Sequence, residues 1–341
     1  MAILFAMEGA VSQGVLWGLM TLGVYLTFRI LNVADMTVDG SFAAGGAITA
    51  VLITKGMNPY LTLLFVFLMG MICGLVTGFM NTKLKINILL ASILTQIALY
   101  SINIRIMGKA NTPLIGSPTM MSKFVAGIAA ILAIFKKPDD MEDFIDTISD
   151  YLSTTTTSLI LGVIIIAIVI IVMYWFFGTE YGSAIRATGS NEHMVRALGV
   201  NTDITKIIGL MISNGMVAMS GALVAQSQGY ADVGMGTGTI VVGLASIIIG
   251  EVIFGSHFGM WYTLISVVLG SVIYRIVIAV VLQLGLKSTD LKLLTALIVA
   301  VSLSIPVIKN KIDRRRKAYK GPENEKDTRH IDDEFKHRSD I

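Results

Sequence analysis

Polar and ionisable side chains lie inside, or directly beside, long uncharged stretches of this sequence. Inside a membrane such groups are costly, so they usually face the interior of a helix bundle. The same side chains serve to line the path of a solute or to hold neighbouring helices together, and both interpretations stay open here. The candidates for lining a solute pathway are Asp35, Asp39, Ser41, Ser92, Gln96, Asn103, Asn214, Gln226, Asp232 and Arg275.

Two of these candidates carry opposite charges and are expected at a similar depth. Asp232 and Arg275, together with Arg105, fall toward the outer side when depth is counted at about 1.5 Å per residue along a helix. An amino acid carries a carboxylate and an ammonium group, so Arg275 and Asp232 would suit its two ends. A structural ion pair of Asp232 with Arg275 or Arg105 is the competing interpretation. The same count places Glu251 near the opposite face and excludes a Glu251–Arg275 pair.

Nothing in the sequence indicates catalysis or metal binding. The four histidines, His193, His257, His330 and His337, form no cluster with carboxylates at metal-ligand spacing. The lone cysteine, Cys73, lies in an apolar stretch and is expected to be a small buried hydrophobic residue. The chain contains no GxxxxGK[ST] stretch and therefore no P-loop of its own. We expect no catalytic residues, no metal and no cofactor in this chain.

The elements that must position the candidates are membrane-spanning helices. Of the 341 residues 54% are hydrophobic and only 14% are charged, whereas a soluble domain has about a quarter charged. A span needs about 20 apolar residues, and the stretch 41–54 is short enough to predict a half-buried or discontinuous helix. The expected segments are 9–28, 41–54, 59–80, 86–104, 158–178, 207–228, 233–250, 257–274 and 293–308. These about nine segments predict an all-α polytopic membrane protein.

Positive charge indicates which loops are cytoplasmic. Basic residues are enriched in the tail 309–341, in the connection 179–206 and at Lys83 and Lys85, and an alternating count of segments puts all three on one side. The segment 108–157 then forms an extracytoplasmic loop, with an interfacial helix at 124–135 and an acidic amphipathic helix at 141–152. The N-terminus is expected outside. Residues 1–308 form the transmembrane domain, and the charged tail is expected to be disordered.

The sequence contains an internal repeat. Ala34-Asp35 and Ala231-Asp232 each follow a predicted span, and each is followed by glycines and a further apolar helix. Four segments follow this scheme on each side of the segment 158–178, so an odd segment in the middle makes the two halves inverted. Inverted repeats with interrupted helices in matching positions are typical of transporters. The alternative is two ordinary loops.

The cytoplasmic connection contains a short helix delimited by Gly189 and Gly199. Ser190 suits its N-cap, and Gly199 suits the position after its end. Glu192 and Arg196 form a favourable i,i+4 pair. Its apolar face requires a cover, either a cytoplasmic partner or the membrane interface. The residues that we expect to contact such a partner are Ser190, Asn191, Glu192, Met194, Val195, Arg196, Leu198 and Gly199.

Several stretches resemble permeases of ABC importers of the branched-chain amino acid and ribose group. The stretches 189–200 and 34–41 resemble that group's coupling loop and the motif after its first span. Four further stretches resemble the subfamily of tryptophan and tyrosine uptake permeases: 80–86, 98–108, 220–226 and 243–251. The resemblance runs from about residue 16 to 308. It implies a non-enzymatic permease in the bacterial cytoplasmic (inner) membrane that moves a small solute of the class of aromatic or related amino acids.

The resemblance also implies partners. A second copy of the chain completes the pathway, two cytoplasmic ATPase subunits bind ATP and Mg²⁺ and dock on the coupling helices, and an extracytoplasmic binding protein delivers substrate. The basic cluster 314–317 is expected to contact anionic lipid rather than nucleic acid. The main alternative is an ion-coupled secondary transporter, because inverted repeats also occur in that class. A membrane scaffold without transport is a third hypothesis.

Overall fold

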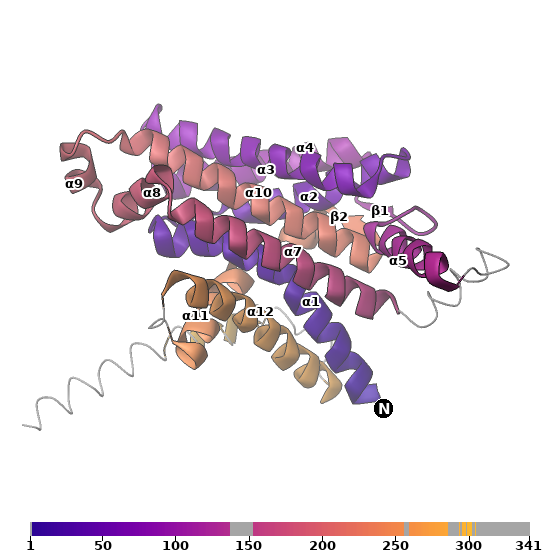
Figure 1. Cartoon of the computed structure of the whole chain (residues 1–341). Coiled ribbons are helices and arrows are strands. Elements are labelled where there is room, and N and C mark those ends of the chain that lie inside the picture. Colours follow the sequence, from indigo (N-terminus) through magenta and orange to yellow (C-terminus); the bar gives the residue numbers. More distant parts are fainter. Residues whose placement is uncertain are drawn as a thin grey trace, which may run out of the picture. The chain divides into compact units, whose positions relative to one another are not determined.

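The computed structural model describes residues 2–136, 153–255 and 259–285, with isolated residues between 293 and 304. The chain is almost entirely helical in these parts (Figure 1). The elements are α1 (Ala2–Tyr25), a π-helical turn η1 (Leu26–Ile30), α2 (Thr37–Thr54), α3 (Pro59–Thr82), α4 (Ile88–Met107), β1 (Asn111–Pro113), α5 (Met120–Lys136), α7 (Thr154–Phe177), α8 (Glu180–Ser190), α9 (Glu192–Ala197), α10 (Thr202–Gln228), β2 (Tyr230–Asp232), a 3₁₀ turn η2 (Val233–Gly236), α11 (Thr239–Phe254) and α12 (Met260–Gln283).

Eight helical segments among the described residues are long and apolar enough to cross a membrane. They coincide with the first eight predicted segments, which confirms a polytopic all-α protein. The expected ninth segment, 293–308, and the tail 309–341 lie largely outside the described residues. One boundary was wrong: the second helix begins at Thr37 rather than residue 41 and has 18 residues. Asp39 therefore lies in its first helical turn, where a carboxylate is favourable, and not in a preceding loop.

Glycines bring the two halves of the bundle into close contact. A Cβ atom at Gly74 of α3 would overlap the Leu210 carbonyl of α10, and one at Gly14 of α1 would lie 2.6 Å from the Cα of Val272 on α12. Small residues of this kind let membrane helices approach each other closely. Helix α1, the first of its half, thus packs on α12, the third helix of the other half, and α10 packs on α3 in the same way.

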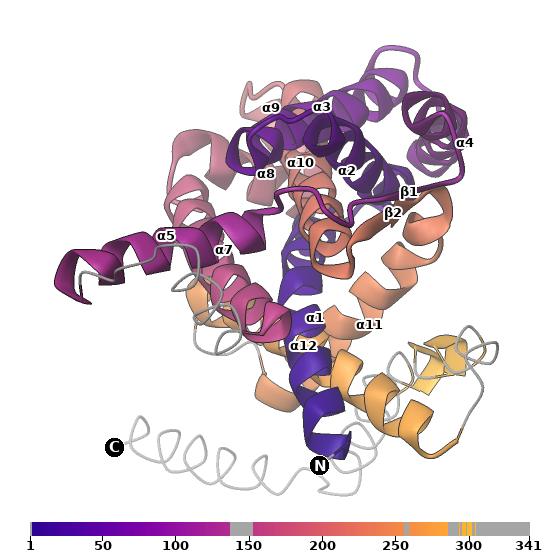
Figure 2. The ribbon, with the colours of Figure 1, turned by 90° about the vertical axis from the view of Figure 1, so that its right-hand side faces the viewer.

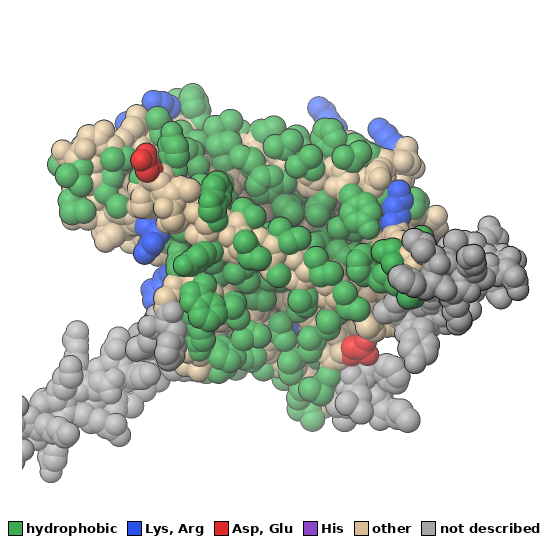
Figure 3. Space-filling view, in the orientation of Figure 1, with side chains coloured by type: hydrophobic (Ala, Val, Ile, Leu, Met, Phe, Trp, Pro, Cys, Tyr) green, Lys and Arg blue, Asp and Glu red, His purple; other side chains and the backbone are tan. Residues whose placement is uncertain are grey.

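Helix α1 lies in the middle of the described bundle. Viewed from the end that carries β1 and β2, it is surrounded by α7, α10, α11 and α12 (Figure 2). Serine hydroxyls attach its backbone to two of these neighbours: Ser213 donates to the Gly23 carbonyl at 2.7 Å, and Ser271 donates to the Gly14 carbonyl at 2.7 Å. Hydrophobic side chains cover the flank of the molecule, and charged side chains gather toward its two ends (Figure 3).

A small antiparallel sheet joins the halves at the end opposite α8 and α9. Strand β1 pairs with β2 in the register Asn111↔Asp232, Thr112↔Ala231 and Pro113↔Tyr230. The sequence interpretation contained no strand here, because segments of three residues carry no readable alternation. A helix is present where the sequence predicts one at 124–135, as the longer α5. The predicted amphipathic helix at 141–152 lies outside the described residues.

Candidate functional site

The chain is interrupted between α1 and α2, and Asp35 organises this first break. Its Oδ1 accepts the Thr37 backbone N–H at 2.9 Å, and its Oδ2 accepts the Asn214 side-chain amide of α10 at 2.7 Å. Asn214 also accepts the Ser41 hydroxyl at 2.7 Å. The Asp35 side chain is only 1% exposed. Irregular backbone inside a membrane protein must be buried or line a cavity, and this network satisfies it internally.

The second break, between α10 and α11, repeats the same local geometry. Asp232 Oδ1 accepts the backbone N–H of Gly234 at 2.7 Å, which is again the residue two positions further on. The two Ala-Asp pairs that define the sequence repeat therefore make equivalent turns. In both halves the aspartate makes a turn in the irregular segment that precedes the next helix, α2 or α11.

Asp39 connects the two breaks. From the first turn of α2, its carboxylate accepts the backbone N–H groups of Gly238 and Ile240, each at 2.9 Å, and the Thr239 hydroxyl at 2.8 Å. These donors are the otherwise unsatisfied groups at the start of α11. The Gln96 amide of α4 adds a longer contact of 3.4 Å. Because four donors occupy this carboxylate, it acts as a cap between helices, and little acceptor capacity is left for a solute.

A cavity of 310 Å³ opens beside this cap, between α2, α4 and η2. Its polar side chains come from Asp39, Gln96, Tyr100, Ser101, Asn103 and Thr237. Asn103 donates to the Gly40 carbonyl at 3.3 Å, whereas its Oδ1 has no hydrogen-bond partner although the residue is 1% exposed. The cavity thus offers the exposed ring of Tyr100, whereas the unpartnered amide oxygen of Asn103 is buried beneath its wall.

The remaining predicted pathway residues lie elsewhere. Ser41 and Asn214 belong to the Asp35 network, and Ser92 donates to the Leu89 carbonyl of its own helix. Gln226 accepts the backbone N–H of Met120 at 2.8 Å and so attaches α5 to α10. The contacts of Ser41, Asn214 and Gln226 hold neighbouring segments together, and none of the four side chains, Ser92 included, lines the cavity. Sequence reasoning overlooked Tyr100, although its spacing of four residues from Gln96 and three from Asn103 places it on the same face.

Asp232 and Arg275 are not brought together. Among the described residues neither forms an ion pair, and Asp232 is engaged with Gly234. The Arg275 guanidinium lies over the Trp17 ring at 3.9 Å from its centroid, while its Nε has no hydrogen-bond partner. The predicted ion pair of Asp232 is therefore wrong, because the aromatic face of α1 meets the cation instead. Glu251 pairs with Arg29 at 2.9 Å, in line with its expected depth near the α8–α9 end.

The connection between α7 and α10 contains two short helices instead of one. Ser190 is the last residue of α8, and Asn191 caps α9 by accepting the Met194 backbone N–H at 3.0 Å. The prediction of Ser190 as N-cap was therefore off by one residue. Gly199 has φ +84° directly after the end of α9, as predicted. Val195 is 2% exposed, whereas Leu198 is 74% exposed, so the predicted apolar face is divided between the protein and its surroundings.

Charged groups attach α9 to the start of α10. Glu192 contacts Arg196 at 3.1 Å, the predicted i,i+4 pair, and Lys206 at 2.6 Å. Arg196 also lies 3.6 Å from Asp203. The hydrogen bond from Lys206 is the largest cause of a lowered pKa of Glu192, and the positive charges of Lys206 and Arg196 add to it. The network therefore holds a small helix on the membrane-spanning bundle. Among the described residues, no three His, Cys, Asp or Glu side chains gather as a metal ion would require.

The sequence was compared with models of protein families and with known proteins. A family described as "Branched-chain amino acid transport system / permease component" matches residues 6–302. A tyrosine transport system permease protein of Clostridioides difficile is 38% identical over 87% of this chain and 91% of its own length. An uncharacterized protein of Rickettsia prowazekii is 32% identical over 86% and 95% of the two chains.

A more distant relative is the probable branched-chain amino acid transport permease protein LivH of Methanocaldococcus jannaschii. It is 25% identical over 65% of this chain and 66% of its own length. No solved structure matches the chain.

Proposed function

Because this chain belongs to the family of branched-chain amino acid transport system permease components, we propose that it forms the membrane path of an ABC importer for an aromatic or related amino acid. The observation that carries the proposal is the cavity beside Asp39, where α2 and α11 begin. The name of the relative that is 38% identical, a tyrosine transport system permease, supports the substrate class. The chain itself is a multi-pass membrane protein of a transport family and carries no proposed catalytic residue.

In the proposed path, the substrate lies against α4. The exposed ring of Tyr100 would pack on an aromatic side chain. The unpartnered Oδ1 of Asn103 is buried, so the Asn103 side chain would have to move before this oxygen could accept a hydrogen bond from an ammonium group. Asp39 would shape the wall of the site by fixing the start of α11, since its own acceptors are occupied. Residues of a second copy would close the open side of the cavity.

The connection with α8 and α9 is proposed as the docking site of a separate cytoplasmic ATPase, which would hold ATP and Mg²⁺. Met194 and Leu198 present exposed apolar side chains, whereas the Glu192–Lys206 pair keeps α9 attached to the transmembrane bundle. A partner that covers Met194 and Leu198 could thus push directly on the start of α10. An extracytoplasmic binding protein would deliver substrate at the opposite end, near α5 and the β1–β2 sheet.

Reconstitution into vesicles tests the proposal. The chain is co-purified with candidate ATPase and binding-protein subunits, and uptake of labelled tyrosine and tryptophan is followed with and without ATP. Leu198→Glu is expected to weaken ATPase association and uptake together, because it places a charge in the docking surface. Leu84→Glu, an exposed leucine between α3 and α4, serves as the matched control.

The outcomes separate the substrate from the mechanism. Tyr100→Ala is expected to lower uptake with ATPase association intact. ATPase association without uptake of either amino acid would reject the substrate and keep the permease. Uptake driven by an ion gradient without any ATPase would instead establish an ion-coupled secondary transporter.

A further inference from the structure

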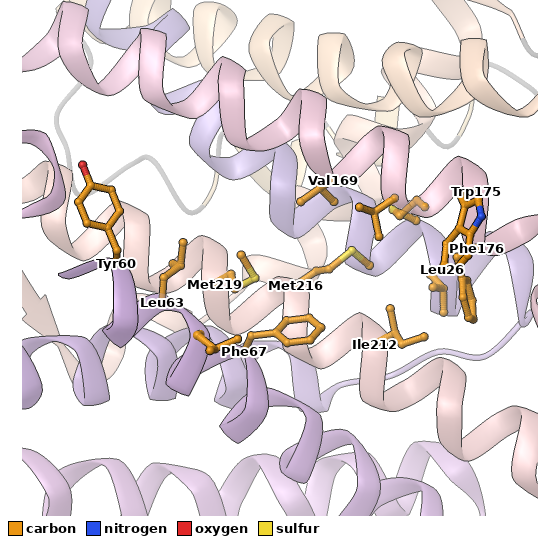
Figure 4. Close-up of a pocket in the computed structure, with 13 residues that line it drawn as sticks. Leu26, Tyr60, Leu63, Phe67, Val169, Trp175, Phe176, Ile212, Met216 and Met219 are labelled. Atoms are coloured by element: carbon orange, nitrogen blue, oxygen red, sulfur yellow. The ribbon is translucent and has the colours of Figure 1, made fainter. Parts of the chain in front are cut away.

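A second, strongly apolar cavity lies on the flank of the bundle, separate from the cavity beside Asp39. It has a volume of 470 Å³ and runs between α3 and α7 with α10 as its floor. Tyr60 stands at one end of this groove, and Leu26, Trp175 and Phe176 stand at the other (Figure 4). Every lining residue is hydrophobic or aromatic. The size falls within the range of about 300–1,000 Å³ that is typical of small-molecule sites.

The groove opens toward the hydrocarbon of the membrane. Helix α7 exposes most of its length, and several wall residues are exposed as well, among them Leu64 and Val172. A hollow in this environment cannot be filled by water, because its walls offer no hydrogen bonds. Leaving it empty would forfeit the dispersion contacts of the lining atoms. A hydrocarbon chain satisfies both conditions.

At the α8–α9 end, the groove meets a second pocket of different character. Trp175, which is 70% exposed, belongs to both cavities. The second pocket has a volume of 610 Å³ and includes Trp261, Thr179 and Arg186. Tryptophan rings of this kind settle at the level of the lipid headgroups. The transition from apolar wall to polar pocket at Trp175 therefore matches the transition from acyl chain to headgroup.

Arg186 supplies the charge of this pocket. Within the described parts of the chain, its guanidinium takes part in no hydrogen bond or ion pair, whereas nearby Arg29 is paired with Glu251. Arg186 also borders a third cavity, together with Arg29 and Ser190. Basic pockets between helices on the cytoplasmic side are suited to anionic lipid headgroups, and a guanidinium binds phosphate through two parallel hydrogen bonds.

We propose that an anionic phospholipid occupies this site, with its phosphate at Arg186, its glycerol region beside Trp175 and Trp261, and one acyl chain in the groove between α3, α7 and α10. The bound lipid thereby contacts α7 and α8, the elements that lead into the connection with α9. This inference does not depend on the transported substrate or on the ATPase.

Quenching of tryptophan fluorescence by lipids with brominated acyl chains tests the headgroup. The full chain carries Trp261→Phe, so that Trp175 is the exposed tryptophan and Trp17 is buried. Phosphatidylcholine vesicles receive a minor fraction of brominated phosphatidylglycerol or brominated phosphatidylcholine. We expect brominated phosphatidylglycerol to quench Trp175 as if it were enriched about fivefold at the site relative to brominated phosphatidylcholine. This factor corresponds to the roughly 1 kcal/mol that one basic residue contributes near a membrane surface.

Two matched pairs of variants locate the lipid. Arg186→Gln is expected to abolish the preference, and Lys83→Gln, which removes a positive charge at the same end but outside the pocket, is expected to keep it. Val169→Phe fills the groove and should lower quenching by both lipids. Val163→Phe, on an exposed part of α7 outside the groove, should leave quenching unchanged.

The proposal is overturned by equal quenching by the two lipids, by a preference that survives Arg186→Gln, or by unchanged quenching in Val169→Phe. If Arg186→Gln does not fold, Arg186→Lys replaces it. This variant keeps the charge without the planar guanidinium, so a reduced but measurable preference supports the site, and full retention shows general surface attraction instead.

Discussion

Replacing Asp39 by alanine removes the carboxylate that connects α2 to the start of α11. The backbone N–H groups of Gly238 and Ile240, which it accepts at 2.9 Å, then lose their partner inside the bundle. The hydroxyl of Thr239 can rotate toward another acceptor, so we count only the two N–H groups. A buried donor left without a partner costs about 1–3 kcal/mol. We therefore expect Asp39→Ala to lower the free energy of unfolding by about 2–6 kcal/mol.

Asp39→Asn should cost less, about 1–3 kcal/mol by the same principle. Its amide oxygen still accepts one of the N–H groups, whereas its NH₂ group faces the other donor and the negative charge at the helix N-terminus is lost. The matched control is Asp232→Ala, because that aspartate also stands at a helix break but accepts a single N–H. Loss of one such cap costs about 1 kcal/mol.

Unfolding of the purified protein in mild detergent, titrated with denaturant and followed by far-UV circular dichroism, gives the three free energies. We expect Asp39→Ala to lower the free energy of unfolding most, Asp39→Asn to lower it less, and Asp232→Ala to lower it least. If Asp39→Ala were no more destabilising than Asp232→Ala, the carboxylate would not carry the junction between the halves, and the reasoning from its hydrogen bonds would be refuted.

Two further predictions concern the attachment of α9 and the packing of α3. At pH 7, amide hydrogens of α9 should exchange faster in Glu192→Gln than in the wild type. The pKa of Glu192 is lowered in the folded protein. The difference in exchange rate should therefore persist below the usual glutamate pKa near 4.3 and vanish only as the pH falls through the lowered pKa. A difference that does not change with pH would contradict this account. In a thermal melt, Gly74→Ala should destabilise the protein by about 1–3 kcal/mol, since the new methyl group overlaps the Leu210 carbonyl. The control Gly127→Ala on α5, where nothing lies within 4 Å, should be neutral or stabilising. Equal effects of the two substitutions would reject the close-packing argument.

Hydropathy predicted the spans because a membrane helix must be long and apolar, but it placed the start of α2 too late. Asp39 lowers the local hydropathy, although a carboxylate in the first turn of a helix is favourable. The same residue shows why partners were out of reach: its donors lie near position 239, about two hundred residues away in the chain. A charge in an apolar context marks a residue as important without revealing what it contacts.

Local chemistry left two other choices undetermined. Ser190 and Asn191 are both good N-caps, and only the backbone shows that Asn191, with φ −155°, separates α8 from α9. For Arg275, counting depth along the helix suggested an acidic partner, yet the guanidinium lies on the Trp17 ring. Counting along one helix gives depth but not the direction of a side chain around the helix axis, and direction decided this contact.

The junctions between the halves have a mechanical consequence. Asp39 holds α11, Asp35 holds α10, and the β1–β2 sheet closes one end, so that each half is fastened to the other at several levels. Opening a passage by separating the halves would break these bonds, and no water could replace the buried Asp35–Asn214 bond. Motion against a neighbouring protein molecule would break none of them. Movement of the described bundle as one body, with α9 attached to it through the Glu192–Lys206 pair, therefore costs less than separation of its halves.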